Sequence, residues 1–248
     1  MHRIVYMVLS HPLKAAYLFS RIWWCSVQKK KDYAESFKWA KKTTILANKA
    51  GNVTIESHGL ENIPKEDGFV LFPNHQGLFD MLVFLESFPR PFAFVIKKEA
   101  SNIILLKQVT KSLGSLAIDR EDIRQSMTVI KTMTEEVKKG RNFLIFAEGT
   151  RSRQGNVPLE FKGGSFKSAV KAKCPIVPCA LIDSFVPFDQ KGTKPVAVKI
   201  IYLKPLLYEE YKDMKTVEIA NEVRTRIVEA IAQYTKPEND SENRSTQA

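Results

Sequence analysis

The stretch VLFPNHQGLFD, residues 70–80, joins a short apolar run to a polar cluster that contains a histidine. A short apolar run that ends at a proline is typical of a buried strand. Asn74 and His75 follow the run directly, and Asp80 comes five residues after the histidine. The stretch therefore predicts a strand that ends in a loop carrying chemically active groups.

Three further apolar runs end in polar clusters in the same way. These runs and the groups that follow them are FAFVI with Lys97, SLAI with Arg120, and FLIF with Glu148, Gly149, Thr150 and Arg151. Open α/β sheets place their sites outside the carboxyl ends of parallel strands. If most of these strands are parallel, four dispersed clusters therefore form one pocket with one histidine, several carboxylates and several cations.

Short β-type runs alternate with helical segments from residue 53 onward. The seven runs lie at 53–57, 69–72, 92–96, 115–118, 143–146, 175–181 and 196–203. This alternation predicts an α/β fold, with a largely parallel or mixed sheet flanked by helices. A chain of 248 residues with 44% apolar content is long enough for one such domain and a full core. We assign that domain to residues 51–235.

Two helices of this domain are marked by apolar residues at helical spacing. The first is expected from Asp122 to Lys139, and we expect its apolar face, methionines included, in the core. That face comprises Ile123, Met127, Ile130, Met133 or Thr134, and Val137. The second covers residues 216–234 and is expected to dock through Val217, Ala220, Val223, Ile227 and Ile231. The polar tail at 236–248 is expected to be disordered.

Residues 1–50 differ from the rest in being rich in aromatic and basic side chains. We expect two amphipathic helices here, the second at 33–49, that anchor the protein at a membrane surface. A span across the bilayer is disfavoured because Lys14 would lie near its middle, beside Pro12. Packing of these helices on the domain itself is the alternative.

The net charge of +11 favours anionic partners, among them phosphorylated molecules, acidic proteins, anionic lipid and nucleic acid. The three cysteines lack a C-x-x-C spacing, so neither a disulfide framework nor a zinc ribbon is indicated. The four histidines show no paired ligand spacing, and we expect no metal and no cofactor.

His75 is the natural proton acceptor of the expected pocket, because imidazole takes up a proton near neutral pH. Asp80 could hold the imidazole N–H, as in a triad that lacks its serine. No G-x-S-x-G turn is present, so the nucleophile could be a hydroxyl of the substrate. A structural histidine is the alternative for His75, and a solvated basic loop is the alternative for residues 148–153.

Together these blocks resemble the 1-acylglycerol-3-phosphate acyltransferases, within the wider glycerolipid acyltransferases. NHQGLFD is similar to the family's N-H-x-x-x-x-D, or HX4D, block, and FAEGTRS to its F-P-E-G-T-R-S block, with Ala147 in place of the usual proline. Residues 97–120 resemble the family's substrate-binding segment, and PIVPCALI its closing block. The order and spacing agree over residues 59–182, which a chance match to one motif would not produce.

The resemblance implies an acyltransferase that forms phosphatidic acid. His75 would deprotonate the sn-2 hydroxyl of 1-acylglycerol 3-phosphate, which attacks the thioester of acyl-CoA or acyl-acyl carrier protein without an acyl-enzyme, and Asp80 would orient the histidine. The residues expected to bind substrate are Asn74, Lys97, Arg120, Glu148, Gly149, Thr150 and Arg151. Such an enzyme would lie at the cytoplasmic face of the membrane, peripherally or interfacially anchored.

Other functions stay open at this point. The acceptor could be another lysophospholipid or glycerol 3-phosphate. A non-enzymatic basic module that binds membranes or nucleic acid would not need His75, Asp80 and Glu148 among its cations, and we expect no nucleic-acid partner. A catalytically inactive scaffold is disfavoured because both His75 and Asp80 are present.

Overall fold

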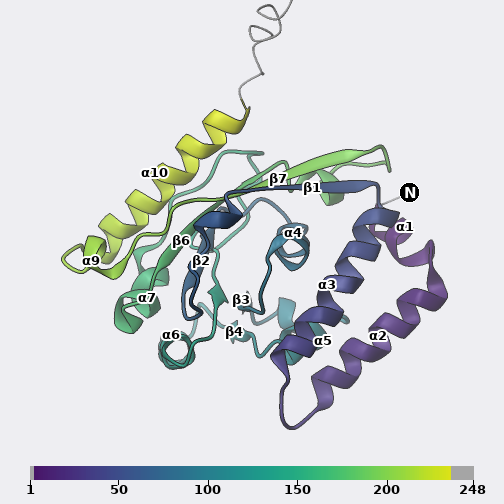
Figure 1. The fold of residues 1–248 in the computed structure, drawn as a ribbon, viewed down its shortest axis with the longest axis horizontal. Helices are drawn as coiled ribbons and strands as arrows, with labels where there is room; N and C mark the ends of the chain where they lie inside the picture. Colours follow the sequence, from purple (N-terminus) through teal and green to yellow (C-terminus); the bar gives the residue numbers. More distant parts are fainter. Residues whose placement is uncertain (1–2, 236–248) are drawn as a thin grey trace, which may run out of the picture.

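The computed structural model describes residues 3–235, which form a seven-stranded sheet with helices on both faces (Figure 1). The strand order is β1-β7-β6-β2-β5-β3-β4. The strands are β1 (Val53–His58), β2 (Val70–Pro73), β3 (Ala93–Lys97), β4 (Leu116–Ile118), β5 (Phe143–Leu144), β6 (Ile176–Ile182) and β7 (Val196–Tyr202). Each of the seven apolar runs forms one of these strands, so the α/β prediction is confirmed.

The helices fill the connections between the strands and both ends of the described chain. The α-helices are α1 (Arg3–Leu9), α2 (Pro12–Val27), α3 (Tyr33–Ala50), α4 (Asp80–Ser87), α5 (Leu106–Ser112), α6 (Ile123–Lys138), α7 (Lys167–Ala172), α8 (Val186–Asp189), α9 (Tyr208–Tyr211) and α10 (Thr216–Thr235). Short 3₁₀ turns are η1 (Leu60–Asn62), η2 (Ala100–Asn102) and η3 (Gly163–Phe166). The tail at 236–248, predicted to be disordered, lies outside the described residues.

The sheet is mixed, and its central part is parallel. Strands β6, β2, β5, β3 and β4 all run in one direction. β7 is antiparallel to β6, and β1 is parallel to β7. The carboxyl ends of the five parallel strands therefore lie along one side of the sheet, which we call the carboxyl edge. The four polar clusters all follow strands of this set, as the sequence predicted.

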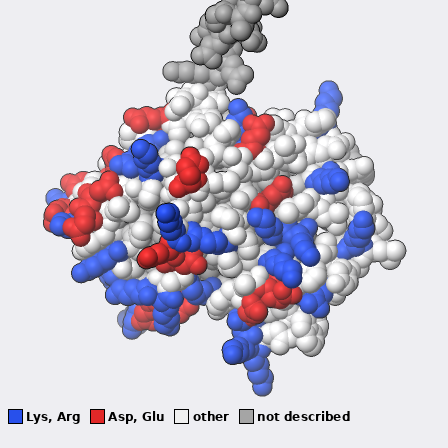
Figure 2. All heavy atoms as spheres, viewed as in Figure 1, with Lys and Arg blue, Asp and Glu red and all other residues white. Residues whose placement is uncertain are grey.

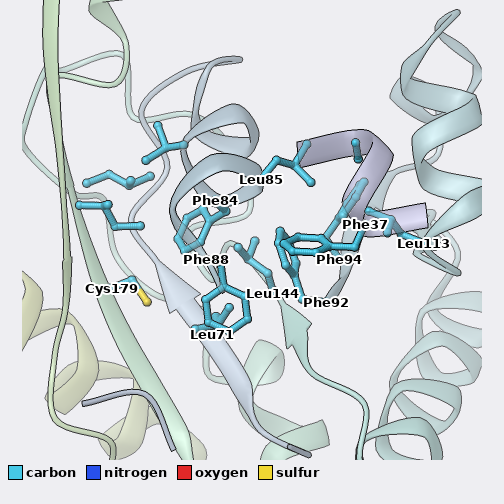
Figure 3. Close-up of a cluster of buried hydrophobic side chains, with 14 of the residues drawn as sticks. Phe37, Leu71, Phe84, Leu85, Phe88, Phe92, Phe94, Leu113, Leu144 and Cys179 are labelled. Atoms are coloured by element: carbon cyan, nitrogen blue, oxygen red, sulfur yellow. The ribbon is translucent and has the colours of Figure 1, made fainter. Parts of the chain in front are cut away.

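Successive residues of the central strands face opposite layers. In β2, Leu71 packs in the cluster that also contains Phe84 of α4 and Phe88 directly after it, whereas Val70 and Phe72 pack in the cluster on the other face. Figure 3 shows the first cluster, in which side chains of α3 and α4 meet those of the strands. The second cluster is covered by α6, α7 and α10. The strands are buried on both faces, which explains their nearly continuous apolar sequences.

The apolar stripes of α6 and α10 are buried only in part. Met133 and Val137 lie in the core, as predicted, but Ile123 is 74% exposed and Met127 is 65% exposed. In α10 the predicted core residue Val217 is 60% exposed, while Ile227 is fully buried. The prediction was wrong for the first turns of both helices. The neighbouring strands β4 and β5 are only three and two residues long, so the first turns of α6 have little sheet to cover.

The N-terminal segment contains three helices rather than the two predicted. The first expected helix is divided at Pro12, which begins α2, and His11 before it is non-helical. The residue that precedes a proline is disfavoured in the α conformation, which explains the break. Ile22 of α2 and Phe37 of α3 belong to the same buried cluster as the sheet. Among residues 3–235 no helix has both the length and the apolarity to cross a bilayer.

The contrast within α10 predicts how two substitutions affect stability. Ile227→Ala is expected to lower the free energy of unfolding by about 2–5 kcal/mol, because it leaves a cavity in the core. Val217→Ala, in the same helix but exposed, is expected to change it by less than about 0.5 kcal/mol. Urea denaturation of both variants measures the difference, and equal losses would contradict the burial pattern described above.

Candidate active site

The predicted contact between His75 and Asp80 is present at the carboxyl edge. β2 ends at Pro73, and a short turn leads through His75 to Asp80, the first residue of α4. Imidazole Nδ1 and carboxylate Oδ2 are 2.7 Å apart. The Asp80 side chain is fully buried, and that of His75 is 21% exposed. Since Nδ1 is engaged, Nε2 is the ring nitrogen that remains for a substrate proton.

The buried Asp80 carboxylate accepts further hydrogen bonds. The backbone N–H groups of Gln76 and Gly77 donate to it at 2.7 Å and 3.1 Å. The hydroxyl of Ser184, which follows β6, donates to Oδ1 and lies 3.0 Å from the amide oxygen of Gln76. Burying a carboxylate charge is costly unless hydrogen-bond donors surround it, and these groups supply them. The carboxylate is therefore fixed, and it fixes the imidazole in turn.

Phe146 covers one face of the imidazole. The two rings are stacked with centroids 4.0 Å apart and planes inclined by 22°. Phe146 follows β5 and lies two residues before Glu148 in FAEGTR. Neither Phe146 nor Ser184 was predicted from the sequence as a positioning residue. Only the place of Phe146 inside a recognised block offered a signal, whereas nothing in the sequence pairs Ser184 with Asp80.

Glu148 connects the His75 turn to the loop after β5. Its carboxylate accepts the backbone N–H of His75 at 2.6 Å and that of Leu159 at 3.0 Å. The residue is only 2% exposed, and burial raises the pKa of its carboxyl although the two N–H groups oppose this shift. In the structure both carboxylate oxygens therefore bind backbone. The substrate contact expected of Glu148 stays a prediction.

Asn74 also binds the protein frame. Its amide nitrogen donates to the carbonyl of Leu181 at 3.0 Å, and its amide oxygen accepts the N–H of Leu181 at 2.7 Å. Leu181 lies in β6, next to β2 in the sheet. Asn74 thus joins two strand ends directly beside His75, and its expected role in substrate binding stays a prediction.

Two cations converge on the turn at Gly149. A Cβ atom on Gly149, whose φ is +78°, would lie 3.1 Å from Nζ of Lys162 and 3.4 Å from Nη1 of Arg120. Arg120 was predicted to bind substrate, but Lys162 was not. Partial burial lowers the pKa of Arg120 from its ordinary value, yet a guanidinium stays charged in proteins. Thr150 is exposed next to this turn.

The other two predicted cations, Arg151 and Lys97, have different neighbours. Arg151 lines a cavity of about 640 Å³ together with Arg153, Phe185 and Phe188. Lys97 is exposed and forms an ion pair with Glu99 at 3.1 Å. Within residues 3–235, no acidic side chain lies within 4.0 Å of Arg120, Arg151 or Lys162. These three cations are therefore free to bind an anion.

The cysteines do not provide a nucleophile for this site. All three are buried. Burial raises the pKa of the Cys174 thiol to about 12 and raises that of Cys179 well above its ordinary value. Because the thiolate is the reactive form, these two side chains are inert near neutral pH. In the described part of the chain, no three His, Cys, Asp or Glu residues form a group that could hold a metal ion.

Comparison with solved structures supports the fold. The 1-acyl-sn-glycerophosphate acyltransferase of Thermotoga maritima superposes with a TM-score of 0.76 over 95% of this chain and 96% of that chain. Because the two sequences are only 21% identical, this likeness shows a shared fold and nothing finer.

Sequence comparison supports the family. The family model described as Acyltransferase matches residues 54–182, just over half of the chain. The probable 1-acyl-sn-glycerol-3-phosphate acyltransferase of Mycoplasma genitalium is 30% identical over 192 residues, covering 72% of this chain and 70% of that protein. The Borreliella burgdorferi enzyme of that name is 32% identical over 51% of this chain and 50% of its own length. The chain belongs to the 1-acyl-sn-glycerol-3-phosphate acyltransferase family of enzymes.

Proposed function

We propose that the protein transfers a fatty acyl group from a thioester to the sn-2 hydroxyl of 1-acylglycerol 3-phosphate and so forms phosphatidic acid. The observation that carries this proposal is the His75–Asp80 pair at the carboxyl edge, 2.7 Å apart. The names of the relatives described above support the choice of acceptor.

His75 acts as the general base of the reaction. Nε2 removes the proton of the acceptor hydroxyl while the oxygen attacks the thioester carbonyl, and Asp80 stabilises the resulting imidazolium. When the C–S bond breaks, the electron pair goes to the sulfur of the leaving thiolate, which takes up the proton. The acyl group passes directly to the acceptor, in agreement with the lack of a reactive thiol among Cys174 and Cys179.

Arg120 and Lys162 bind the phosphate of the acceptor. Both lie at Gly149, one residue from the Glu148 carboxylate that holds the backbone of His75. A guanidinium and an ammonium without acidic partners suit a phosphomonoester. Arg151 adds positive charge in the neighbouring cavity, beside Phe185 and Phe188. Both candidate donors, acyl-CoA and acyl-acyl carrier protein, are anionic, so these cations favour either of them.

The protein binds the cytoplasmic face of the membrane peripherally, through α1 and α2. The aromatic residues Tyr17, Trp23 and Trp24 of α2 are 47–56% exposed, and aliphatic residues of α1 from Ile4 to Leu9 are 40–63% exposed. Exposed aromatics of this kind suit the headgroup region. On the face viewed in Figure 2, basic and acidic side chains are interspersed, which does not resemble the uniform basic track that a nucleic-acid backbone prefers.

The first test is transfer of a labelled acyl group to 1-acylglycerol 3-phosphate in lipid vesicles. His75→Ala is expected to lower kcat by roughly 10²–10⁴-fold, because it removes the general base. His58→Asn, a histidine change on the edge strand β1, serves as the matched control and is expected to keep full activity. Wild-type activity on another lysophospholipid only would change the acceptor, whereas unchanged activity of folded His75→Ala would exclude the mechanism.

The second test concerns the acceptor phosphate. Arg120→Ala and Lys162→Ala are each expected to raise KM for 1-acylglycerol 3-phosphate by roughly 10- to 100-fold, since each removes a charged hydrogen bond. Any residual transfer to monoacylglycerol, which lacks the phosphate, should not change. Lys138→Ala, remote from the carboxyl edge, is the control. Equal losses with both acceptors would assign the two cations a structural role instead.

The raised pKa of Glu148 predicts a pH-dependent stability difference. The folded state binds the proton of the Glu148 carboxyl more tightly than the unfolded chain does. The stabilisation that this group provides is therefore full below the unfolded pKa of about 4.3 and is lost as pH rises through the raised pKa of the folded state. Glu148→Gln does not titrate there. The stability of the wild type minus that of Glu148→Gln should therefore fall with rising pH in urea denaturation. Glu160→Gln, an exposed carboxylate, is the control, and a pH-independent difference for Glu148→Gln would contradict the expectation.

A further inference from the structure

Three consecutive large apolar side chains are exposed between β3 and α5. Ile103 is 57% exposed, Ile104 is 79% exposed and Leu105 is 39% exposed. Single exposed apolar residues are common on protein surfaces, but contiguous ones mark contact with an apolar partner. The three residues lie within the segment 97–120 that resembles the family's substrate-binding block, but none of them is among the residues expected to bind substrate.

The backbone of this segment is ordered in a conformation that presents these side chains. The N–H of Ile103 bonds the carbonyl of Ala100, and the N–H of Lys107 bonds the carbonyl of Ile103. Leu105 has φ 70° and ψ −51°, a region that non-glycine residues rarely adopt, and its N–H bonds the Gln108 side chain at 2.8 Å. Such backbone strain is found preferentially at functional positions.

A second exposed apolar group lies at the same corner of the sheet. Ile123 and Met127 occupy the first turns of α6, which follows β4, and both are mostly exposed. β3 and β4 are adjacent and parallel, so the segments after them share the carboxyl edge. Lys98 joins the two segments, because its side chain lies 3.2 Å from Asp119. We call the residues Ile103, Ile104, Leu105, Ile123 and Met127 the apolar corner.

The charge beside Ile103, Ile104 and Leu105 suits an anionic bilayer, whereas the acids Glu121 and Asp122 are exposed next to Ile123. Residues 100–118 contain no acidic side chain but include Lys107 and Lys111. The acids at the two ends of this segment, Glu99 and Asp119, are ion-paired with Lys97 and Lys98. Lysines that flank exposed aliphatic side chains are typical of segments that enter the headgroup region.

The apolar corner is next to the helices assigned to membrane binding. α5 begins at Leu106, directly after Leu105, and packs against α2. Figure 1 shows α5 beside α2, on the side of the molecule formed by α2 and α3. The apolar corner therefore extends the exposed aromatic surface of α2 onto the catalytic domain.

We infer that the apolar corner inserts into the surface of an anionic lipid bilayer, as a second contact besides α1 and α2. This inference rests on the membrane association in the proposed function. Two contacts on different parts of the molecule fix its tilt on the membrane, whereas one amphipathic segment leaves it free to rotate. The carboxyl edge, which carries both the apolar corner and His75, then faces the leaflet that holds the acceptor.

A fluorescent probe at residue 104 tests the insertion. Ile104→Cys is labelled with an environment-sensitive fluorophore, and labelling is selective because the three native cysteines are buried. The labelled chain is mixed with vesicles of phosphatidylglycerol and phosphatidylcholine, with and without a quencher on the lipid acyl chains. Lys138→Cys, exposed on the far end of α6, is the matched control. We expect a blue shift and quenching at residue 104 and neither at residue 138.

A paired activity measurement uses the double variant Ile103→Ser/Ile104→Ser. Transfer to an acceptor embedded in vesicles is expected to fall several-fold, while transfer to a dispersed short-chain acceptor stays at the wild-type level. Because both side chains are exposed, the variant is expected to fold normally, and an unchanged urea midpoint would verify this.

The outcomes separate this inference from the proposed function. Vesicle binding and acyl transfer without a probe response at residue 104 would overturn the insertion and leave the function intact. A probe response in a chain that transfers no acyl group would support the insertion and exclude the function. A shift that needs no vesicles and grows with protein concentration would identify the apolar corner as an interface between copies, and a wild type that binds no vesicles would exclude both membrane contacts.

Discussion

The buried carboxylate of Asp80 is the interaction on which the site and the surrounding fold both depend. It accepts the imidazole N–H of His75, the backbone N–H groups of Gln76 and Gly77, and the hydroxyl of Ser184. Those donors come from the turn after β2 and from the end of β6, and Asp80 itself begins α4. The charge can stay buried only while all of these groups are in place. The same bonds therefore hold three elements together and fix the imidazole.

The backbone and the ring face of His75 make three further contacts. Its backbone N–H binds Glu148, its carbonyl accepts the N–H of Ser152 at 2.8 Å, and its ring stacks on Phe146. Two acids in the site thus have different tasks: Asp80 binds the ring, and Glu148 binds the backbone. A side chain held by four separate contacts loses little entropy when substrate arrives, and such a preorganised imidazole suits the general base proposed above.

The sequence was sufficient to predict those features that depend on local pattern. The seven apolar runs became the seven strands, and the polar residues after four of them share the carboxyl edge because the central strands are parallel. Features that depend on distant contacts were not predictable. Ser184 and Lys162 reach the site only through the tertiary fold, since Ser184 is 104 residues from Asp80. The engagement of Asn74 and Glu148 by backbone groups also follows from neighbouring strands rather than from the motifs.

The error in α6 shows what hydrophobic spacing can and cannot report. Its apolar residues recur at helical spacing from Ile123 to Val137, but only the later ones, such as Met133, lie on the sheet. Hydrophobic spacing reports that a helix face avoids water, and it does not say whether protein or lipid covers that face. Under the inferred membrane contact, protein covers the later part of this stripe and lipid covers its first turns. The stripe passes from the core at Met133 and Val137 to the exposed apolar corner at Ile123 and Met127 within a single helix.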